Sequence, residues 1–574
     1  MRVDPITIEI VTGRVHEVTA TMEHALYHAG YSPILRESRD GTAGITDARG
    51  RVLMIGGGLQ YHSLPYEQAV ACVRARFGDE GIRPGDTFVV NDPYKAGNSH
   101  VPDFVAVTPA FHENVLIGFG VSIAHKTDVG GLVPGSSSGA SREIFHDGML
   151  IPPVRYMTAD GVNEAVEDII RNNSRTPAAV IGDLRGQIGA TRLAGKGLAA
   201  LCDEYGRDCV VSVMQSILDL TARRLRAELA AFPDGEASAE GKLDHDGARF
   251  DTPVRIAARV KKTGDRLLID LSGCDPQTLG PVNLTPWTAK AVSFLAILAA
   301  TDPTIPVNSG LGDCVDFILP EGSTVNPRFP ATMNSYFPTA SLVHACVLSS
   351  LGQLNPKRAV APSGLASGAI ALGYARGRHG RPAVQYELSG AGLGGTAEHD
   401  GAPIVSPMNH FVAGAAVEVL ESEYPVMVRR YDMWTDSAGA GRTRGGVGIV
   451  REYEMLDDCV MTLRASMHKY GAWGVRGGKP PAISRSVLDP GKPSQEILPS
   501  SGTRDLKPGS VLLFHRAGGA GYGSPLERDP DLVLRDVQDG YVSIEAARDV
   551  YGVAITEDMT RVDAGATRAL RAGA

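Results

Sequence analysis

Apolar residues near the start of the chain recur at steps of three and four, which predicts an amphipathic helix. The stripe consists of Ile8, Val11, Val15, Val18, Met22 and Leu26. Asp4 can cap such a helix, Pro5 suits its first turn, and Gly30 is a good stop. A single apolar face of this length is typical of a helix that packs against a protein core.

Shorter apolar runs after this helix predict strands that alternate with loops rich in glycine and asparagine. Residues 43–46 and 51–55 flank a turn and are expected to form a hairpin. A helix is expected over residues 65–77. Further short strands are expected at three places: 87–90, 104–107 and 115–123.

The pattern changes in the middle of the chain. Residues 163–230 carry leucine, valine and isoleucine at helical spacing and are expected to be mainly helical. Segment 232–241, Phe-Pro-Asp-Gly-Glu-Ala-Ser-Ala-Glu-Gly, breaks this composition and is expected to be a linker or a long turn. Beyond it we expect a hairpin and two buried helices, at 254–271, 285–301 and 338–353.

From residue 389 onward the chain is rich in glycine, and it ends in a charged segment with a helical pattern. The whole pattern predicts a mixed α/β (α+β), multidomain fold. The expected domains are 1–232, a central α+β domain at 245–388, and a glycine-rich, β-containing C-terminal domain at 389–574.

The composition is that of an ordinary globular chain and disfavours several classes of function. Of the 574 residues, 43% are hydrophobic and 21% are charged, and the net charge is −9. No block of lysine and arginine is present, so no nucleic-acid partner is expected. The seven cysteines form no Cys-x-x-Cys pair, which favours a cytoplasmic location. The longest apolar run, 291–300, is half of the roughly 20 residues that a membrane helix needs, so no membrane partner is expected.

The strongest candidate chemistry lies in two loops beside the predicted strands 104–107 and 115–123. His100 and Asp103 stand just before the first strand, and His125 follows the second. An antiparallel pairing of these strands brings both loops to one end of a sheet. Imidazole and carboxylate ligands suit Zn, Mn or Fe with one position open to water, and such a metal lowers the pKa of that water. We therefore expect a metal site in the 1–232 domain, in loops at the ends of short antiparallel strands.

The same histidines also have plainer interpretations. His100 alone could be a solvated loop residue, because His-x-x-Asp occurs by chance in many proteins. His62 and His146 lie in loops framed by glycine or proline and could also line the pocket. Three histidines fall on the first predicted helix and are interpreted as surface or packing residues: His16, His24 and His28.

Several strings follow one another in a fixed order along nearly the whole chain. In the first part they are Asn91-Asp-Pro-Tyr94, His100-Val-Pro-Asp103, Ala124-His125, Asp128-Val-Gly-Gly131 and Ser141-Arg-Glu-Ile-Phe-His-Asp-Gly148. Later ones are Pro281-Val-Asn283, Tyr424-Pro425, Gly439-Ala-Gly-Arg442 and Gly518-Gly-Ala-Gly-Tyr-Gly-Ser-Pro525. Together they resemble the hydantoinase B/oxoprolinase family, which includes subunits of N-methylhydantoinases, caprolactamase-like lactamases, and acetone or acetophenone carboxylases. Segment 333–338, Met-Asn-Ser-Tyr-Phe-Pro, departs from a Gly-Asn pair that many relatives carry.

The resemblance implies one divalent metal, Zn or else Mn or Fe, and a defined ligand set. The four positions that match the ligand set are Asp40, His100, Asp103 and His125. Asp92 and Asp128 are reserves, either as ligands or as partners that orient the histidines. Catalytic roles, orienting a water or moving a proton, are expected of Asp128 or His146.

The resemblance also implies an ATP-dependent hydrolase that opens cyclic amides such as hydantoins, lactams or oxoproline (EC 3.5.2-like). A partner subunit of the hydantoinase A type, carrying Mg-ATP, is expected to phosphorylate the amide oxygen. Water activated by the metal then attacks the activated carbon. This chain shows no Walker A motif, since Gly189-Ala-Thr-Arg-Leu-Ala-Gly-Lys-Gly197 has the wrong spacing. ATP is therefore expected on the partner, in a hetero-oligomer.

Two other functions stay open. A ketone carboxylase subunit of the acetone or acetophenone type would join an enol phosphate to activated bicarbonate, and a non-catalytic scaffold would hold a structural metal or none. The glycine-rich strings at 439–446 and 518–525 could cradle phosphate but are interpreted as structural turns. Residues 135–139, Gly-Ser-Ser-Ser-Gly, match a nucleophile elbow only formally, because a loop precedes them, and are interpreted as shaping the pocket.

Overall fold

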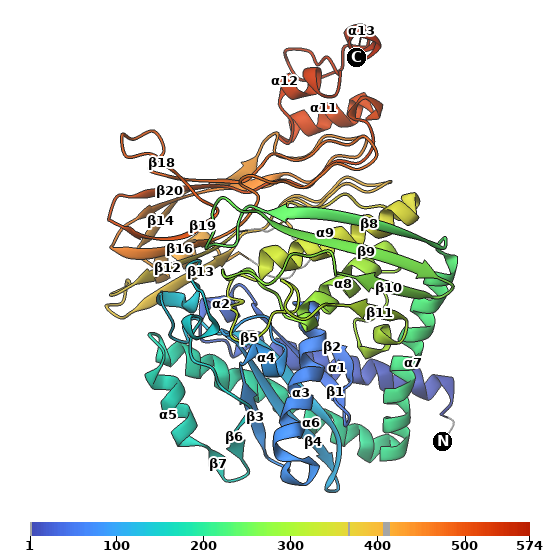
Figure 1. Cartoon of the computed structure of the whole chain (residues 1–574), viewed down its shortest axis with the longest axis vertical. Helices are drawn as coiled ribbons and strands as arrows, with labels where there is room; N and C mark the ends of the chain where they lie inside the picture. The colour runs from blue at the N-terminus through green and yellow to red at the C-terminus, as the bar shows by residue number, and fades with distance from the viewer. Residues whose placement is uncertain (1–2, 366–367, 406–413, 574) are drawn as a thin grey trace.

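A computed structural model describes residues 3–365, 368–405 and 414–573 and shows several sheets stacked along one long axis (Figure 1). The mixed α/β, multidomain class expected from the sequence is confirmed. Within the described residues, no helix is both long and apolar enough to cross a membrane.

The N-terminal layer is a seven-stranded sheet in the order β2-β1-β5-β4-β3-β6-β7. Its strands are β1 (Gly41–Asp47), β2 (Val52–Ile55), β3 (Thr87–Val90), β4 (Asp103–His112), β5 (Val115–His125), β6 (Val154–Thr158) and β7 (Gly161–Val162). The helices of this part are α1 (Pro5–His28), α2 (Pro33–Arg36), α3 (Ser63–Phe77), α4 (Pro93–Ala96), α5 (Glu164–Asn172), α6 (Pro177–Tyr205) and α7 (Arg207–Ala231).

The predicted first helix is confirmed as α1, and its apolar stripe buries Val11, Val15, Met22 and Leu26 in a core shared with α6 and α7. Asp4 caps it by accepting hydrogen bonds from the backbone N–H groups of Ile6 and Thr7. Helix α3 contributes side chains to a separate core beside β3, β4 and β5. Helices therefore anchor the central strands β4 and β5, whose ends form the candidate site.

Strands β4 and β5 form the antiparallel pair expected from the sequence. The connection between them is two residues, Glu113 and Asn114, both with positive φ (48° and 62°). Such a turn matches the natural twist of a hairpin. The register shifts by one residue between Ala110 and Phe111, and beyond this shift Asp103, the first residue of β4, lies directly opposite His125, the last residue of β5.

The expectation of a linker at 232–241 is wrong, because most of it belongs to strand β8 (Gly235–Leu243). Its residues alternate between exposed and partly buried positions, and β9 pairs with it along its whole length. Small alanines and glycine replace the large apolar residues that usually mark a strand, so the composition resembled a turn. The expected domain ranges stay a prediction.

The central part is a four-stranded sheet, β11-β10-β9-β8, with two buried helices beside it. Its other elements are β9 (Val254–Thr263), β10 (Arg266–Asp270), β11 (Val315–Ile318), α8 (Pro286–Ala300) and α9 (Phe337–Leu354). The predicted hairpin at 254–271 and the two predicted helices are confirmed.

Two further sheets form the glycine-rich part. The first, β13-β12-β16-β19, consists of β12 (Ala369–Tyr374), β13 (Ala383–Leu388), β16 (Cys459–Arg464) and β19 (Ser501–Leu506). The second, β14-β15-β20-β17-β18, consists of β14 (Val426–Trp434), β15 (Gly448–Met455), β17 (Arg485–Leu488), β18 (Glu496–Leu498) and β20 (Val511–His515), with α10 (Val417–Glu423) before it.

The glycine-rich strings pack backbone against backbone. The N–H of Gly439 donates to the carbonyl of Gly519, and the N–H of Gly519 donates to that of Gly446, both at 2.8 Å. A Cβ on Gly445 would lie 1.9 Å from the carbonyl oxygen of Gly519. This close approach agrees with the interpretation of these strings as structural turns.

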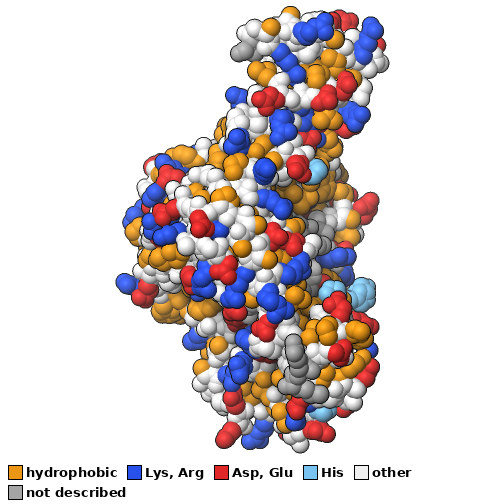
Figure 2. Space-filling model, turned by 90° about the vertical axis from the view of Figure 1, so that its right-hand side faces the viewer, with side chains coloured by type: hydrophobic (Ala, Val, Ile, Leu, Met, Phe, Trp, Pro, Cys, Tyr) orange, Lys and Arg blue, Asp and Glu red, His pale blue; other side chains and the backbone are white. Residues whose placement is uncertain are grey.

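The chain ends in a lobe of three short helices that projects from the body at the top of Figure 1. They are α11 (Pro530–Gln538), α12 (Ile544–Asp549) and α13 (Ala564–Ala572). The lobe has a small core of its own around Val533 and Tyr551, which also contacts Ala440. Figure 2 shows basic and acidic side chains interspersed over this lobe, as expected for the charged end segment.

Candidate metal centre

Three neighbouring strands deliver three of the predicted ligands to one edge of the N-terminal sheet. Strand β5 lies between β1 and β4, and His125 ends it. Asp103 begins β4, and Asp40 directly precedes β1. The backbone N–H of His125 donates to the carbonyl of Asp40 at 3.1 Å. Antiparallel pairing thus brings residues that are distant in sequence to adjacent strand ends.

His100 reaches the same edge from the loop between α4 and β4. The side-chain amide of Asn98 holds this loop by donating to three carbonyls, those of Asn91, His100 and Asp103. The N–H of Asp103 donates to the carbonyl of His100 at 3.1 Å. The loop is therefore fixed by buried hydrogen bonds, which orients the imidazole before any ligand binds.

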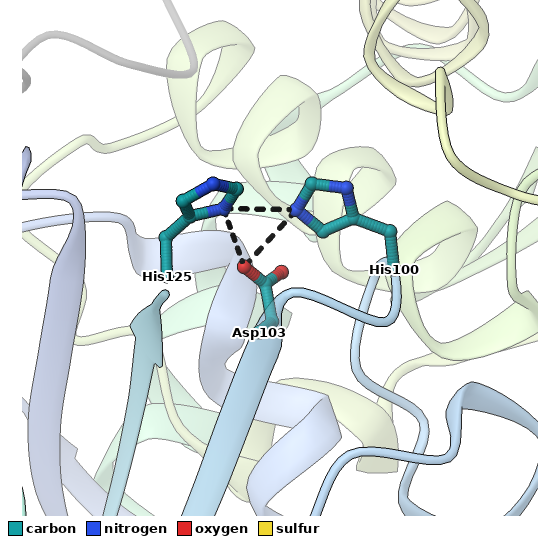
Figure 3. A group of neighbouring side chains, drawn as sticks. All are labelled: His100, Asp103 and His125. Carbon is teal, nitrogen blue, oxygen red and sulfur yellow. Dashed lines mark hydrogen bonds and ion pairs between the residues drawn. The ribbon is translucent and has the colours of Figure 1, made fainter. Parts of the chain in front are cut away.

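Two imidazoles and one carboxylate converge at this edge, as Figure 3 shows. His100 Nε2 lies 3.1 Å from Asp103 Oδ1 and 3.2 Å from His125 Nδ1, and His125 Nδ1 lies 3.4 Å from Asp103 Oδ1. Metal–ligand bonds of about 2.0–2.2 Å place neighbouring ligand atoms roughly 3.0–3.5 Å apart. The three side chains are 3%, 2% and 1% exposed, so water does not solvate them from outside.

The hydrogen bonds around the triad favour a cation between its members. His100 Nδ1 lies 3.2 Å from the carbonyl oxygen of Asn334, which can only accept a hydrogen bond. The proton of a neutral His100 therefore sits on Nδ1, and the lone pair of Nε2 faces Asp103 and His125. Among the described residues, Asp103 Oδ2 and His125 Nε2 are buried and have no hydrogen-bond partner. The carboxylate oxygen Oδ1 of Asp103 and the Nε2 lone pair of His100 face each other, which fits a bound metal ion.

Burial and mutual charge shift the pKa values of the acidic groups in opposite directions. Burial opposes ionisation of Asp103, but the facing His100 and His125 outweigh it and lower the pKa of this carboxyl. Burial, followed by the charge of Asp103, raises the pKa of Asp40 to about 8. Burial lowers the pKa of His125 to about 4, which keeps its imidazole neutral and able to coordinate.

Asp40 lines the same cavity as the triad, although its carboxylate is outside the compact group of three. The cavity measures about 30 Å³. On this scale one water needs roughly 10–15 Å³, so the space suits a metal ion and a water rather than an organic ring.

The far wall of this cavity comes from segments that the sequence analysis did not assign to the site. Residues 334–338, at the start of α9, lie over His100, and the Tyr336 ring is 5.0 Å from the His100 ring. The Tyr386 ring, on β13, is 4.6 Å from the His125 ring. Arg464, the last residue of β16, donates to the carbonyl of Asn334 and to the hydroxyl of Tyr386.

Two signals in the sequence could have pointed to this wall. The departure from the family pattern at 333–338 falls on it, as does an arginine that ends the mostly apolar strand β16. Tyr61 completes the wall and shares a hydrogen bond of 3.0 Å with the hydroxyl of Tyr336. Burial comes first among the causes that raise the pKa values of Tyr61, Tyr336 and Tyr386, so all three keep their protons.

The structure does not bring Asp128 or His146 to this cavity. The Asp128 carboxylate accepts from the N–H groups of Gly130 and Gly135 and pairs with Arg175 at 3.1 Å. It therefore holds the 128–135 loop. His146 is partly exposed, and its Nδ1 accepts from the backbone N–H of Arg142.

The other candidates of the sequence analysis also have structural partners. Asp92 caps α4 and pairs with Lys95 at 3.0 Å. His62 shares a hydrogen bond with Thr42 at 3.0 Å, and burial lowers its pKa to about 4. In the formal Gly-x-Ser-x-Gly string, the Ser136 hydroxyl accepts from the N–H of Val129 and donates to the carbonyl of Gly130, which stabilises a loop.

Comparisons with known proteins agree with the architecture of this site. A family model described as hydantoinase B/oxoprolinase matches residues 4–525. The putative B subunit of a D-/L-hydantoinase from Pseudomonas sp. (strain NS671) is 31% identical, covering 99% of this chain and 98% of that protein. The acetophenone carboxylase delta subunit of Aromatoleum aromaticum is 26% identical over 93% of this chain and 84% of its own length.

A solved structure extends the likeness to three dimensions. The ATP-dependent caprolactamase of Pseudomonas jessenii superposes with a TM-score of 0.90 at 29% identity, with both chains covered completely. The order of the motifs, the fold and the extent of the match agree over nearly the whole length. The chain belongs to the hydantoinase B/oxoprolinase family.

Proposed function

We propose that this chain is the metal-binding subunit of an ATP-dependent cyclic amidase, which opens a hydantoin, lactam or oxoproline-type ring by hydrolysis of its C–N bond. One observation carries the proposal: two imidazoles and a carboxylate converge, buried, with their acceptor atoms facing each other. The full-length likeness to a caprolactamase and to a hydantoinase component supports the choice of substrate class.

His100, Asp103 and His125 would hold one divalent metal, Zn or else Mn or Fe, with Asp40 as the fourth ligand. Such an ion polarises a bound oxygen and lowers the pKa of water to near neutrality. The pKa of Asp40 is raised because this carboxyl is buried beside Asp103. A cation bound next to it would favour the ionised carboxylate that coordination needs, so the site fits a metal ion at this position.

The wall opposite the ligands supplies fixed hydrogen-bond donors. Arg464 is buried and anchored to Asn334 and Tyr386, so its charge stays beside the cavity without a carboxylate within ion-pair distance in the described structure. A fixed guanidinium suits the anionic oxygens of a phosphorylated amide. The neutral hydroxyls of Tyr61 and Tyr336 can donate to a departing nitrogen or oxygen on the same side.

Activation of the amide is assigned to a partner. Amide resonance makes the ring carbon a poor electrophile, and phosphorylation of the amide oxygen removes this resonance. This chain lacks a Walker A motif, and the caprolactamase with the matching fold is described as ATP-dependent. We therefore assign Mg-ATP to an ATP-binding subunit of the hydantoinase A type, in a hetero-oligomer with this chain.

The length of the relatives favours an amidase over a ketone carboxylase. This chain spans the caprolactamase structure completely but only 84% of the acetophenone carboxylase subunit.

Consumption of bicarbonate during turnover would identify the carboxylase instead. A scaffold role predicts that the metal, if any, has no exchangeable water.

The experiment measures metal content and ATP-dependent ring opening in the same preparations. The wild-type chain, His100→Ala, His125→Ala and the control His146→Ala are each analysed for metal and assayed on caprolactam and hydantoin with the ATP-binding subunit. We expect about one metal per chain in wild type and control, and loss of metal with at least about a thousandfold loss of turnover in the ligand variants. Full metal in both ligand variants would contradict the assignment.

A further inference from the structure

A second cavity, much larger than the metal pocket, lies between the N-terminal part and the β12–β13 hairpin. It measures about 900 Å³ and is lined by residues 30–33, Arg36, Thr127, 174–179, 378–379, 381–384, Glu423 and Tyr424. Sites for small organic molecules commonly measure about 300–1,000 Å³. The metal pocket measures about 30 Å³ on the same scale, so an organic substrate needs further space and this groove offers it.

Basic side chains outnumber acidic ones in the lining of the groove, although the chain as a whole carries a net charge of −9. Four arginines line it, Arg36, Arg175, Arg378 and Arg381, and the single carboxylate among its lining residues is Glu423. A local excess of positive charge on an acidic protein attracts anions to one place.

The charges available to a ligand come from the β12–β13 hairpin. Arg175 is occupied by Asp128 and by the carbonyls of the 130–133 loop, and Arg36 pairs with Glu37 at 2.8 Å. Arg378 uses only its Nε, which donates to the carbonyl of Tyr424 at 3.1 Å. Arg381 has no hydrogen bond or ion pair within the described residues. The guanidinium ends of Arg378 and Arg381 are therefore free to bind an anion.

The remaining wall of the groove is mixed. Serines and threonines line part of it, and an apolar or aromatic part consists of Tyr31, Pro33, Pro177, Val384 and Tyr424. An inorganic anion gains no binding energy from an apolar surface, whereas an organic anion can pack its apolar part against it. Arginine and an apolar wall together favour a ligand with a phosphoryl group and a compact carbon skeleton.

The groove and the metal pocket share one strand. Val384 lines the groove, whereas Tyr386 and Leu388 line the metal pocket. Residues two apart point to the same face of a strand and lie about 7 Å apart, so the two cavities follow one another along one face of β13. Thr127, which also lines the groove, is two residues beyond His125.

We propose that this groove binds an organic phosphate, with its phosphoryl group on Arg378 and Arg381 and its apolar body on the wall around Tyr31 and Val384. The inference rests on the proposed function in one respect, namely that the phosphorylated cyclic amide made by the partner subunit is the expected ligand. Held there, this dianionic intermediate lies against β13, the strand whose next residues, Tyr386 and Leu388, line the metal pocket.

The test uses phenyl phosphate as the probe and the full-length chain after dialysis against a chelator, so that the phosphate has no metal to bind. Isothermal titration compares wild type, the Arg378→Ala/Arg381→Ala double variant and the control Arg376→Ala, which is on the same hairpin but outside the groove. We expect saturable binding that weakens by about tenfold or more in the double variant and with added salt, and is nearly unchanged in the control.

Several results would overturn the proposal. They are equal affinity in the double variant, no saturable binding by wild type, or binding of inorganic phosphate as tight as that of phenyl phosphate, which would mean that the apolar wall is unused. The single variant Arg381→Gln guards against misfolding, because this exposed side chain makes no hydrogen bond or ion pair with the described residues, and it should still weaken binding.

Failure of this inference and failure of the proposed function are separable. Phenyl phosphate binding requires neither metal nor partner, so it can succeed even if no lactam or hydantoin is opened. Conversely, ring opening by the reconstituted complex together with unchanged phenyl phosphate binding in the double variant rejects the groove alone.

Discussion

Two regions of this protein are rich in loops that suggested ligand binding in the sequence, and the fold uses them in opposite ways. The loops around His100 and His125 surround buried polar atoms, such as Asp103 Oδ2 and His125 Nε2, that have no hydrogen-bond partner in the described part of the chain. The glycine-rich loops at 439–446 and 518–525 leave no such space, because their backbones donate to one another directly.

The difference shows what distinguishes a binding loop from a structural one. In the first region glycine and asparagine shape the backbone so that side chains point inward at a common centre. In the second, glycine is present because any side chain would overlap a neighbouring carbonyl. A glycine-rich string therefore indicates a binding site only when side chains that can bind a ligand, such as histidine or aspartate, lie beside it.

The largest effect is expected from adding one methyl group to the glycine-rich region. In Gly445→Ala the new Cβ would meet the Gly519 carbonyl oxygen at 1.9 Å, so the backbone must move. We expect the free energy of unfolding to fall by about 3 kcal/mol or more, measured by denaturant or thermal unfolding. Gly312→Ala is the matched control, because its Cβ would meet no atom within 4 Å. Equal stability of both variants would contradict the backbone packing described for this region.

A smaller effect is expected from removing one hydroxyl from the wall of the metal pocket. Tyr386→Phe keeps the ring against His125 but removes the acceptor of an Arg464 hydrogen bond. We expect metal content to be unchanged and kcat to fall by roughly tenfold, because Arg464 loses its fixed position. Tyr374→Phe, in the same sheet but outside the pocket, is the control. Loss of metal from Tyr386→Phe would show that the hydroxyl supports the ligands instead.

The smallest effect concerns a buried histidine of the C-terminal sheets. Burial, with added repulsion from Arg485 and Arg430, lowers the pKa of His515 to about 4. At a pH below 6.5, the ordinary pKa of histidine, His515 is protonated in the unfolded chain but stays neutral in the folded chain. The folded state therefore loses stability as the pH falls from 6.5 towards 4. We expect this loss to be smaller by about 1–2 kcal/mol in His515→Gln, measured as unfolding against pH.

The exposed His399→Gln serves as the reference for that measurement, since its side chain is solvated. If both variants follow the wild-type dependence on pH, His515 does not contribute to the acid sensitivity. Either result tests the C-terminal sheets apart from the metal site, whose ligands are on the N-terminal sheet.

The sequence by itself determined the local elements and half of the candidate site. The 3–4 spacing of apolar residues set α1, because a helix repeats every 3.6 residues. The apolar runs at 104–107 and 115–123 favoured the β4–β5 pair, and its two-residue turn, together with the register shift between Ala110 and Phe111, decides which residues face each other. Asp103 and His125 therefore meet for reasons contained in fewer than 25 consecutive residues.

Only the tertiary structure decided what lies opposite those ligands. Asn334 precedes α9, and Tyr386 and Arg464 lie on β13 and β16. All three are more than 200 residues beyond His125, and no local periodicity says which surfaces will meet. The same reason explains why β8 was taken for a linker, since its small residues become a strand only when β9 pairs with them. Local pattern fixes the face that each element buries, whereas long-range packing chooses its partner.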